Sequence, residues 1–172
     1  MSTWLDRCSR PVEEKIQDRA ALGHILDRER SEGKTIVFTN GCFDLLHVGH
    51  IHTLYIARQQ GDILVVGINS DDSVRAIKGE GRPLVPQRQR AEILAALEAV
   101  DYVVVFHEAD PHRLIEELRP HVLVKGGDWP EDQIIGRELV ESWGGRVLRI
   151  DPVPGASTTE IIHTILNRFG KK

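Results

Sequence analysis

Two histidines three residues apart, His47 and His50, are the pair in this 172-residue sequence whose type and spacing could do chemistry. They lie in residues 39–50, here called the corner, between an apolar β-rich run at 35–39 and a segment ending near 60 with helically spaced apolar residues. This pattern predicts a strand, a turn and a helix. A helix start carries unpaired N–H groups and a positive dipole end, which attract anions. The corner is therefore interpreted as a phosphate site, where the imidazoles would stabilise charge that develops during transfer at phosphorus.

The corner also has simpler interpretations. One histidine could lie at the surface while the other packs in the core. Gly41 and Gly49 would let the backbone approach a ligand closely. Cys42 is either a small packed side chain, which we favour, or a reactive thiol. The sequence has two cysteines, so it predicts neither a disulfide framework nor a cysteine zinc site.

Cations follow in a loop and at a helix start. Lys78 and Arg82 flank two glycines, and such a segment is either a mobile loop that contacts phosphate or an exposed polar turn. Residues 86–100 predict a helix with Arg90 near its start, where a positive charge opposes the macrodipole. Arg90 therefore either extends to solvent or faces an anion, and we favour the anion.

Two later segments also follow predicted strands. The strand at 121–125 ends in a glycine pair followed by Asp128, which could accept a hydrogen bond from the exocyclic amine of a base or form an Asx turn or helix cap. Residues 157–160 read Ser-Thr-Thr-Glu, a capping box that by itself indicates only a well-capped final helix. Because parallel strands end at one edge of a sheet, both segments should meet the corner there.

Strands and helices alternate along the chain. Near-continuous apolar runs predict five buried strands, at residues 35–39, 62–69, 102–106, 121–125 and 146–150. This order indicates an α/β fold, a doubly wound (Rossmann-like) parallel sheet of about five strands with helices on both faces. Residues 1–18 lack a sustained apolar period and are predicted to form a loose or docked arm, followed by one domain over 19–172.

The composition argues against several classes of protein. A net charge of -4 gives no general attraction to nucleic acid or to a membrane surface, and neither partner is expected. No signal peptide precedes the domain, and no apolar run approaches the length that spans a bilayer. A cytoplasmic protein is therefore expected.

The collected motifs resemble the nucleotidyltransferase superfamily with an H-x-G-H signature, here residues 47–50, and a late S-T-T motif, here residues 157–159. Within it, several segments are similar to the heptose 1-phosphate adenylyltransferases, the adenylyltransferase domain of ADP-heptose synthases; these are residues 38–47, 78–83, 97–101 and 124–128. Glycerol-3-phosphate cytidylyltransferases share the first motif but have a lysine and an arginine where this sequence has His52 and residues 153–156. Those departures weaken an interpretation based on CTP.

The resemblance implies transfer of AMP from ATP to D-glycero-β-D-manno-heptose 1-phosphate, giving ADP-heptose and pyrophosphate for lipopolysaccharide core or surface-glycan precursors. It implies that His47 and His50 stabilise the transition state and leaving group, while Lys78 and Arg90 hold the β- and γ-phosphates. Lys125 and Arg82 would bind the sugar phosphate. The residues implied to bind nucleotide are Thr39, Asn40, Gly41, Cys42, Phe43, Asp44, Gly49, Gly127, Asp128, Ser157 and Thr158.

Mg²⁺ is expected with ATP, although no carboxylate cluster identifies protein ligands for it. The resemblance also implies a homo-oligomer, a dimer. Many relatives fuse this domain to a heptose kinase, for which this chain has no room, so a separate kinase is expected. Two alternatives stay open: a cytidylyltransferase that uses CTP, and a nucleotide-binding regulatory protein without transfer activity. The two histidines and Lys78 argue against the second, since binding alone does not need them.

Overall fold

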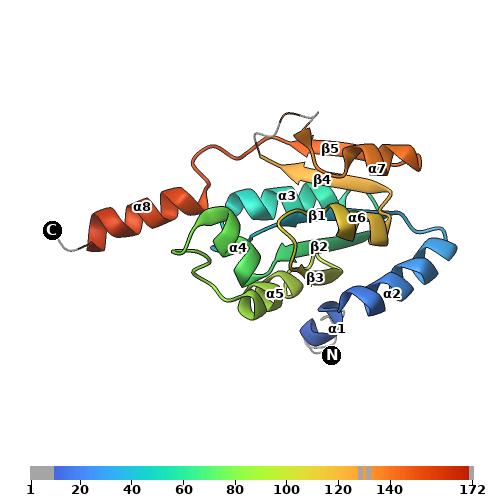
Figure 1. Cartoon of the computed structure of the whole chain (residues 1–172), viewed down its shortest axis with the longest axis horizontal. Helices are drawn as coiled ribbons and strands as arrows, with labels where there is room; N and C mark the ends of the chain where they lie inside the picture. Colours follow the sequence, from blue (N-terminus) through green and yellow to red (C-terminus); the bar gives the residue numbers. More distant parts are fainter. Residues whose placement is uncertain (1–9, 128–129, 131–132, 171–172) are drawn as a thin grey trace, which may run out of the picture.

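The computed structural model describes residues 10–127, 130 and 133–170 and is built on a parallel sheet (Figure 1). Its five strands lie in the order β3-β2-β1-β4-β5, and each pair of neighbours is parallel. The predicted fold class and the predicted strands are confirmed. The strands are β1 (Ile36–Gly41), β2 (Ile63–Asn69), β3 (Tyr102–Phe106), β4 (Val122–Gly126) and β5 (Arg146–Ile150).

Helices cover both faces of the sheet, as strands that are apolar on both sides require. On one face, a core forms beneath α2 (Arg19–Ser31), α6 (His112–Leu118) and α7 (Arg137–Ser142). On the other face, a second core forms beneath α3 (Val48–Arg58) and α5 (Gln87–Ala95). The sheet is therefore doubly wound, and its carboxyl edge is left for other elements.

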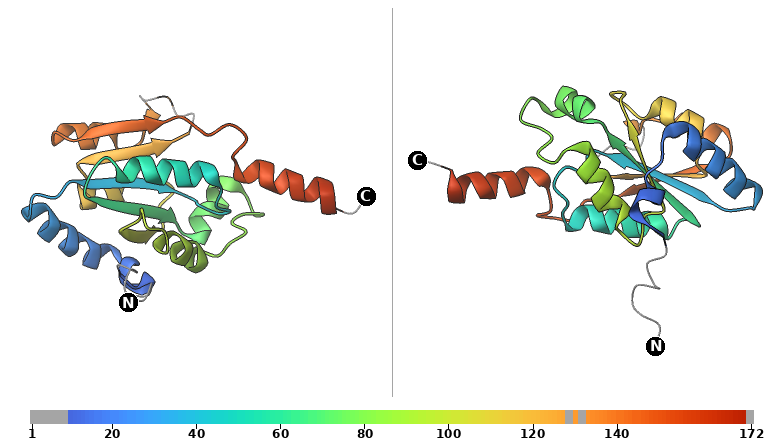
Figure 2. Two further views of the ribbon diagram at one scale, coloured as in Figure 1. Left: turned by 180° about the vertical axis from the view of Figure 1, so that it is seen from behind. Right: turned by 90° about the horizontal axis from the view of Figure 1, so that it is seen from below.

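That edge carries α4 (Asp71–Lys78), which follows β2, and α8 (Thr158–Phe169), which follows β5 through a connector. Figure 2 shows α8 projecting beyond the sheet, and none of its residues is buried. No helix within the described ranges combines the length and the hydrophobicity needed to cross a lipid bilayer.

The central strands β1 and β4 are neighbours, but the chain leaves them in opposite directions. From β1 it continues to α3 on one face, and from β4 it continues to α7 on the other. In open α/β sheets such a reversal opens a crevice at the carboxyl ends of the two strands, where ligands bind. The fold thus places the corner, which follows β1, at the expected position for a binding site.

The described part of the N-terminal arm is docked against the edge strand β3. A short helix, α1 (Val12–Lys15), precedes Ile16, which pairs with Val103 in a parallel bridge. Lys15 is buried, and its Nζ donates hydrogen bonds to the carbonyl oxygens of Leu97 (3.3 Å) and Val100 (2.9 Å). These contacts cover an edge that would otherwise expose unpaired backbone groups.

The helix predicted over residues 86–100 is shorter than expected. It ends as α5 at Ala95, after which the Leu97 N–H donates to the Leu94 carbonyl and the Val100 N–H to the Leu97 carbonyl. Leu97 and Val100 continue the apolar spacing because they pack in the same core as α5, not because they are helical. The prediction failed because apolar residues in the turn after α5 pack in the same core at positions that continue the helical spacing.

The packing of β2 can be tested at Gly67. A Cβ there would lie 2.8 Å from Phe38 Cζ and 3.3 Å from Leu114 Cδ2, so Gly67→Ala should overpack the core and lower the free energy of unfolding by about 1–3 kcal/mol. In Gly23→Ala, the matched control within α2, the Cβ meets nothing within 4 Å, and higher helix propensity should raise stability by up to about 1 kcal/mol. Urea unfolding monitored by circular dichroism measures both, and equal midpoints would contradict the packing.

Candidate functional site

The turn that joins β1 to α3 is held by side chains from distant segments. A guanidinium N–H of Arg90 donates to the carbonyl oxygen of Cys42, and Thr158 Oγ1 donates to the carbonyl oxygen of Leu45 (3.2 Å). Asp44, between them, accepts hydrogen bonds from the loop after α4. Such anchoring fixes a segment that has no ladder or helix bonds of its own.

Phe43 shows why this turn needs anchors. Its φ of 47° lies in the left-handed region, which costs an aromatic residue on the order of 1–3 kcal/mol and persists only where the surroundings enforce it. Its ring packs beside Gly41 and lies with its centroid 5.1 Å from that of His50. The strained residue therefore sits between the end of β1 and the histidine pair.

His47 and His50 stack on one another, with ring centroids 3.8 Å apart and an interplanar angle of 27°. Burial lowers the pKa of both imidazoles, and for His50 burial and the neighbouring His47 lower it to about 4. His50 is therefore neutral at pH 7. Its Nδ1 accepts a hydrogen bond from the backbone N–H of His47 (3.4 Å), which leaves the proton on Nε2 as a donor.

Gly49 joins the histidine pair to the start of α8. A Cβ at this position would lie 3.0 Å from His47 Nδ1 and 3.3 Å from the Ala156 carbonyl oxygen, so only glycine fits without a shift. The Nδ1 atom of His47 is buried and has no hydrogen-bond partner in the described part of the chain. Next along the chain, Ser157 caps α8 by accepting a hydrogen bond from the Glu160 N–H (3.1 Å). The structure thus brings the late Ser-Thr segment to the corner, as predicted.

Lys125, at the end of β4, faces the end of β1. Its Nζ donates a hydrogen bond to Asn40 Oδ1 (2.6 Å), and burial lowers the pKa of its ammonium to about 8. Gly127 follows with a φ of 107°, a conformation that favours glycine, and its N–H donates to the Ile150 carbonyl. Asp128, predicted to bind the nucleobase, lies outside the described residues. A half-buried amine between two strand ends is a candidate for meeting an anion in the crevice.

Two residues predicted to line a nucleotide pocket are buried in the protein. The Asp44 side chain has no exposed surface; it accepts hydrogen bonds from the N–H groups of Leu84 and Val85 and pairs with Arg82 Nε. Burial alone would raise the pKa of Asp44, but these donors lower it overall. Thr39 is buried within β1. Both therefore support the site from beneath, and a direct nucleotide contact by either would require these side chains to leave their buried positions.

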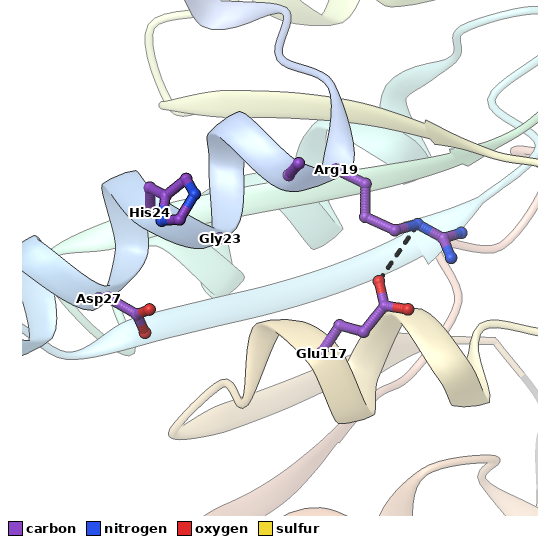
Figure 3. Close-up of a pocket in the computed structure, with 6 residues that line it drawn as sticks. Arg19, Gly23, His24, Asp27 and Glu117 are labelled. Atoms are coloured by element: carbon purple, nitrogen blue, oxygen red, sulfur yellow. Dashed lines mark ion pairs between the residues drawn. The ribbon is translucent and has the colours of Figure 1, made fainter.

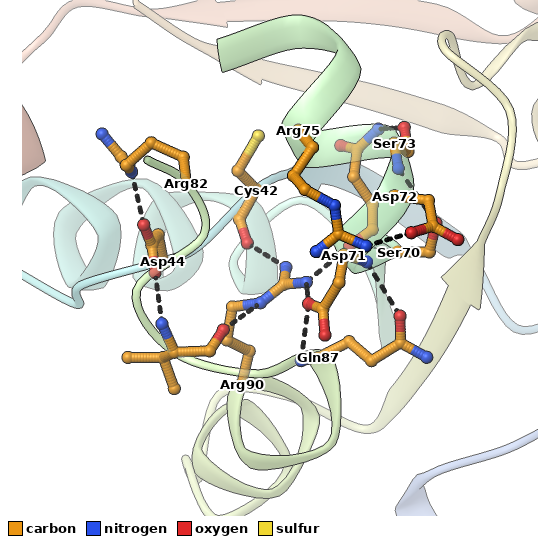
Figure 4. A network of polar contacts seen from close by, with 12 residues as sticks. Cys42, Asp44, Ser70, Asp71, Asp72, Ser73, Arg75, Arg82, Gln87 and Arg90 are labelled. Atoms are coloured by element: carbon orange, nitrogen blue, oxygen red, sulfur yellow. Dashed lines mark hydrogen bonds and ion pairs between the residues drawn. The ribbon is translucent and has the colours of Figure 1, made fainter. Parts of the chain in front are cut away.

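Arg90 also differs from its prediction. Its side chain is fully buried, with Nε donating to the Val85 carbonyl (2.9 Å) and Nη2 to both the Asn69 carbonyl and Asp71 Oδ1 (2.8 Å each), besides the contact with Cys42 (Figure 4). Four of its five N–H groups donate to protein acceptors and the side chain has no exposed surface, so in this conformation Arg90 supports the turn and offers no exposed group to a phosphate. The sequence showed a positive charge at an unfavourable helix position but not the acceptors that surround it.

Lys78 and Arg82 remain candidates for anion contacts. Lys78 ends α4 and is exposed, whereas Arg82 is mostly buried against Asp44. Their charges, with that of Arg90, act on the Cys42 thiol, yet burial dominates and raises its pKa. Cys42 is therefore a packed, protonated side chain at the edge of a basic region, in agreement with the interpretation that we favoured.

Two residues of this region were missed in the sequence. Asp71 and Gln87 bond reciprocally: the Asp71 N–H donates to Gln87 Oε1, and the Gln87 N–H donates to Asp71 Oδ1, both at 2.8 Å. No local pattern around either residue indicates a partner sixteen residues away.

The residues described here include no group of three or more His, Cys, Asp or Glu side chains placed to hold a metal ion. Asp44 and Asp71, the carboxylates that meet the basic region, are both engaged by protein donors. An ion at this site would therefore depend on ligands from a bound anion such as a polyphosphate.

A shallow groove of about 420 Å³ lies away from the corner, between α2 and α6 (Figure 3). Its walls include Gly23, His24 and Asp27, and an ion pair of 3.4 Å between Arg19 Nε and Glu117 spans it. Arg19 forms ion pairs with Glu108 and Glu117, so its guanidinium is already paired with carboxylates of the protein. The groove offers none of the convergent donors found at the corner.

Comparisons with known proteins give matches over most of the chain. A model of the cytidylyltransferase-like family matches residues 38–164, from β1 into α8. The bifunctional protein HldE of Syntrophotalea carbinolica is 57% identical over 155 residues, which cover 90% of this chain and 32% of that protein. HldE of Geobacter sulfurreducens is 56% identical over 158 residues, covering 92% and 32%. The chain thus spans about a third of the length of these curated relatives.

Solved structures share the fold. A lipopolysaccharide core biosynthesis protein from Thermoplasma volcanium is 29% identical, with a TM-score of 0.58 over 70% of this chain and 98% of that chain. A pantoate-beta-alanine ligase from Francisella tularensis, complexed with beta-gamma ATP and beta-alanine, is 18% identical, with a TM-score of 0.60 over 89% of this chain and 76% of that chain. At this identity the second likeness supports the Rossmann-like fold alone.

The protonation state of His50 is directly measurable. In ¹⁵N-histidine NMR spectra at pH 7, His50 should be a neutral Nε2–H tautomer, and acid titration should give a midpoint near 4, because burial and His47 disfavour the imidazolium. A cationic His50 at pH 6, or an Nδ1–H tautomer, would contradict the geometry.

Proposed function

The chain belongs to the cytidylyltransferase-like family, and on this premise we propose that it transfers AMP from ATP to D-glycero-β-D-manno-heptose 1-phosphate. The products are ADP-heptose, a precursor of lipopolysaccharide core or surface glycans, and pyrophosphate. The observation that carries this proposal is the stacked, neutral pair His47 and His50, at a helix start beside the crevice between β1 and β4.

The reaction forms one bond and breaks one. A phosphate oxygen of the sugar 1-phosphate attacks the α-phosphorus of ATP, the bond from that phosphorus to the β-bridging oxygen breaks, and pyrophosphate leaves with the electron pair. The attacking oxygen is already ionised, so no strong base is needed, and catalysis can depend on positioning and charge stabilisation. This requirement fits a site that has hydrogen-bond donors but neither a protein nucleophile nor a general base to activate one.

The side chains have separate roles in this scheme. His50 donates from Nε2 to the phosphate oxygens on which charge develops, and as a neutral imidazole it can do so without exchanging a proton. His47 acts beside it on the leaving group. Lys78 meets the β- and γ-phosphates, and Lys125 with Arg82 meets the sugar phosphate. Arg90 and Asp44 hold these groups in place instead of touching the substrate.

Nucleotide contacts are proposed along the surface of the crevice. Asn40, Gly41, Cys42 and Phe43 would present the end of β1, with Gly49, Ser157 and Thr158 across the helix starts. Gly127 and Asp128 would meet the base. The metal ion would enter as part of the substrate, MgATP, because the described residues include no group of three or more His, Cys, Asp or Glu side chains placed to hold it.

The choice of sugar and nucleotide rests on similarity. The HldE proteins match nearly the whole of this chain at 56–57% identity, and the Thermoplasma volcanium protein is described as acting in lipopolysaccharide core biosynthesis. The lysine and arginine of the CTP-using relatives are absent here, where His52 and Pro154 stand. These features favour ATP and a heptose phosphate over CTP and glycerol 3-phosphate.

Further partners are proposed by the same similarity. The HldE relatives are called bifunctional, and this chain matches about a third of their length. We propose that a heptose kinase supplies the sugar 1-phosphate, that the enzyme acts in the cytoplasm where ATP is available, and that it forms a homodimer.

The activity test follows pyrophosphate release from MgATP and heptose 1-phosphate. The chain should release pyrophosphate, with MgCTP a poorer substrate, and His50→Ala should lower kcat at least about 10²-fold, as expected for loss of a transition-state donor. His24→Ala, a histidine of the distant groove, is the matched control and should match the unchanged chain. Nucleotide binding without any product would instead favour a regulatory protein, and a preference for CTP would favour a cytidylyltransferase.

A second test uses the pH dependence of kcat/KM for the sugar phosphate. Lys125, with a pKa lowered to about 8, is an ammonium below that pH and loses its charge above it, so kcat/KM should fall as pH rises through 8. Lys125→Arg keeps a positive charge at all these pH values and should remove the fall. An alkaline fall that persists unchanged in Lys125→Arg would assign it to another group.

A further inference from the structure

We propose that Asp71 is a positioning residue of the transfer site: it holds the Arg90 guanidinium against the Cys42 carbonyl and thereby keeps the turn at Phe43, and the histidine pair beyond it, in their working conformation. This inference rests on the proposed function for its kinetic consequence. Its geometric content concerns the corner itself and can be measured without any reaction.

The first step is the ion pair. Asp71 Oδ1 accepts from Arg90 Nη2 at 2.8 Å, and Arg90 has no exposed side-chain surface. Asp71 is the only acidic partner that Arg90 has among the described residues, since its other acceptors are carbonyl oxygens. A buried guanidinium depends on such a charge-assisted bond for both its stability and its direction.

The second step is the direction of the guanidinium. Nη2 bonds to Asp71 and to the Asn69 carbonyl at the end of β2, and Nε bonds to the Val85 carbonyl (Figure 4). With these positions fixed, the planar group has one remaining side, and it faces the Cys42 carbonyl. The position of Asp71 therefore determines where Arg90 meets the corner.

The third step is the strain at the corner. Cys42 directly precedes Phe43, the residue with a left-handed φ of 47°, and Asp44 directly follows it. Arg90 holds the carbonyl before the strained residue, and the loop after α4 holds the side chain after it. Loss of the first anchor lets Phe43 relax toward ordinary backbone angles. Because its ring packs near His50, such a change moves the imidazole pair.

Asp71 has a second contact that serves the same site. Its backbone and carboxylate bond reciprocally with Gln87, the first residue of α5, at 2.8 Å in both directions. This joins the start of α4 to the start of α5 and closes the base of the segment that carries Lys78 and Arg82. One carboxylate thus connects the corner with the cationic loop.

The chain supplies a matched control in the next residue. Asp72 lies in the same first turn of α4, is exposed, and pairs with the surface residue Arg75. Asp72→Ala removes the same charge from the same helix start, with the same effect on the macrodipole, but leaves Arg90 and Gln87 untouched.

The kinetic test compares Asp71→Ala and Asp71→Asn with their Asp72 counterparts. Asp71→Ala should lower kcat by roughly 10- to 10²-fold and raise KM for ATP, because misplaced groups lose orientation. KM for ATP should rise more than KM for the sugar phosphate, since Lys125 and Asn40 are held by other strands and Arg82 is the one proposed sugar-phosphate group on the segment that Asp71 anchors. Asp71→Asn keeps an acceptor oxygen and should recover part of the loss. A lower fraction of folded enzyme would reduce Vmax without altering either KM, and that result would overturn the proposal.

The second readout is independent of catalysis. In ¹⁵N-histidine spectra of folded protein, Asp71→Ala should reduce the Nε2–H tautomer of His50 and shift its titration midpoint upward, because the His47 N–H would leave Nδ1. Asp72→Ala should leave the His50 signals unchanged. If both variants give the same His50 spectra as the unchanged chain, the proposal is wrong. If the protein without substitutions shows no transfer activity, the proposed function is refuted but the role of Asp71 is not, because the His50 spectra still test that role.

Discussion

The site depends on a turn that cannot hold its own conformation. Between β1 and α3 the chain has Phe43 in a left-handed conformation, and the turn is stabilised by donors from α5, from the loop after α4 and from the start of α8. Those segments are far apart in sequence and lie at the carboxyl edge because of the order of the strands. The corner is therefore assembled by the fold as a whole, and its conformation depends on these few hydrogen bonds.

Burial acts on the titratable groups of the site in one direction. It lowers the pKa of His47, His50 and Lys125 and raises that of Cys42, so each is shifted toward its neutral form. For the imidazoles this means hydrogen-bond donors without permanent charge, which suits a reaction in which charge moves from one phosphate oxygen to another. Lys125 keeps its charge near neutral pH, where a phosphate arriving in the crevice would reinforce it. Burial therefore leaves the two imidazoles as neutral donors, whereas Lys125 is a cation that loses its charge at mildly alkaline pH.

The fold was predictable because its signals are local and repeated. Near-continuous apolar runs gave all five strands, and their alternation with helices gave the parallel, doubly wound sheet. From strand order alone, the corner and the late Ser-Thr segment could be expected to meet, and Thr158 does bond to Leu45. What the sequence could not show was the direction of side chains: Arg90 and Asp44 have types suited to phosphate and nucleotide, yet both are enclosed by protein partners. The left-handed Phe43 and the pairing of Asp71 with Gln87 likewise depend on contacts that no local pattern encodes.

The predictions for Arg90 and Asp44 show that a charged residue of the site can have a supporting role instead of contacting the substrate. A charged residue in a motif can contact the substrate or hold the residue that does, and burial decides between the two: Lys78 is exposed, whereas Arg90 and Asp44 have no exposed side-chain surface. In the proposed function the corner with its histidines accounts for the reaction type at phosphorus, and its described anchors are contacts within the protein. On the same proposal, selection of base and sugar would come from the opposite side of the crevice, where β4 ends at Gly126 and where α8 begins. Changes in the segment directly after β4 would leave the anchors from α5, from the loop after α4 and from Thr158 intact, so substrate preference can differ while the turn keeps its conformation.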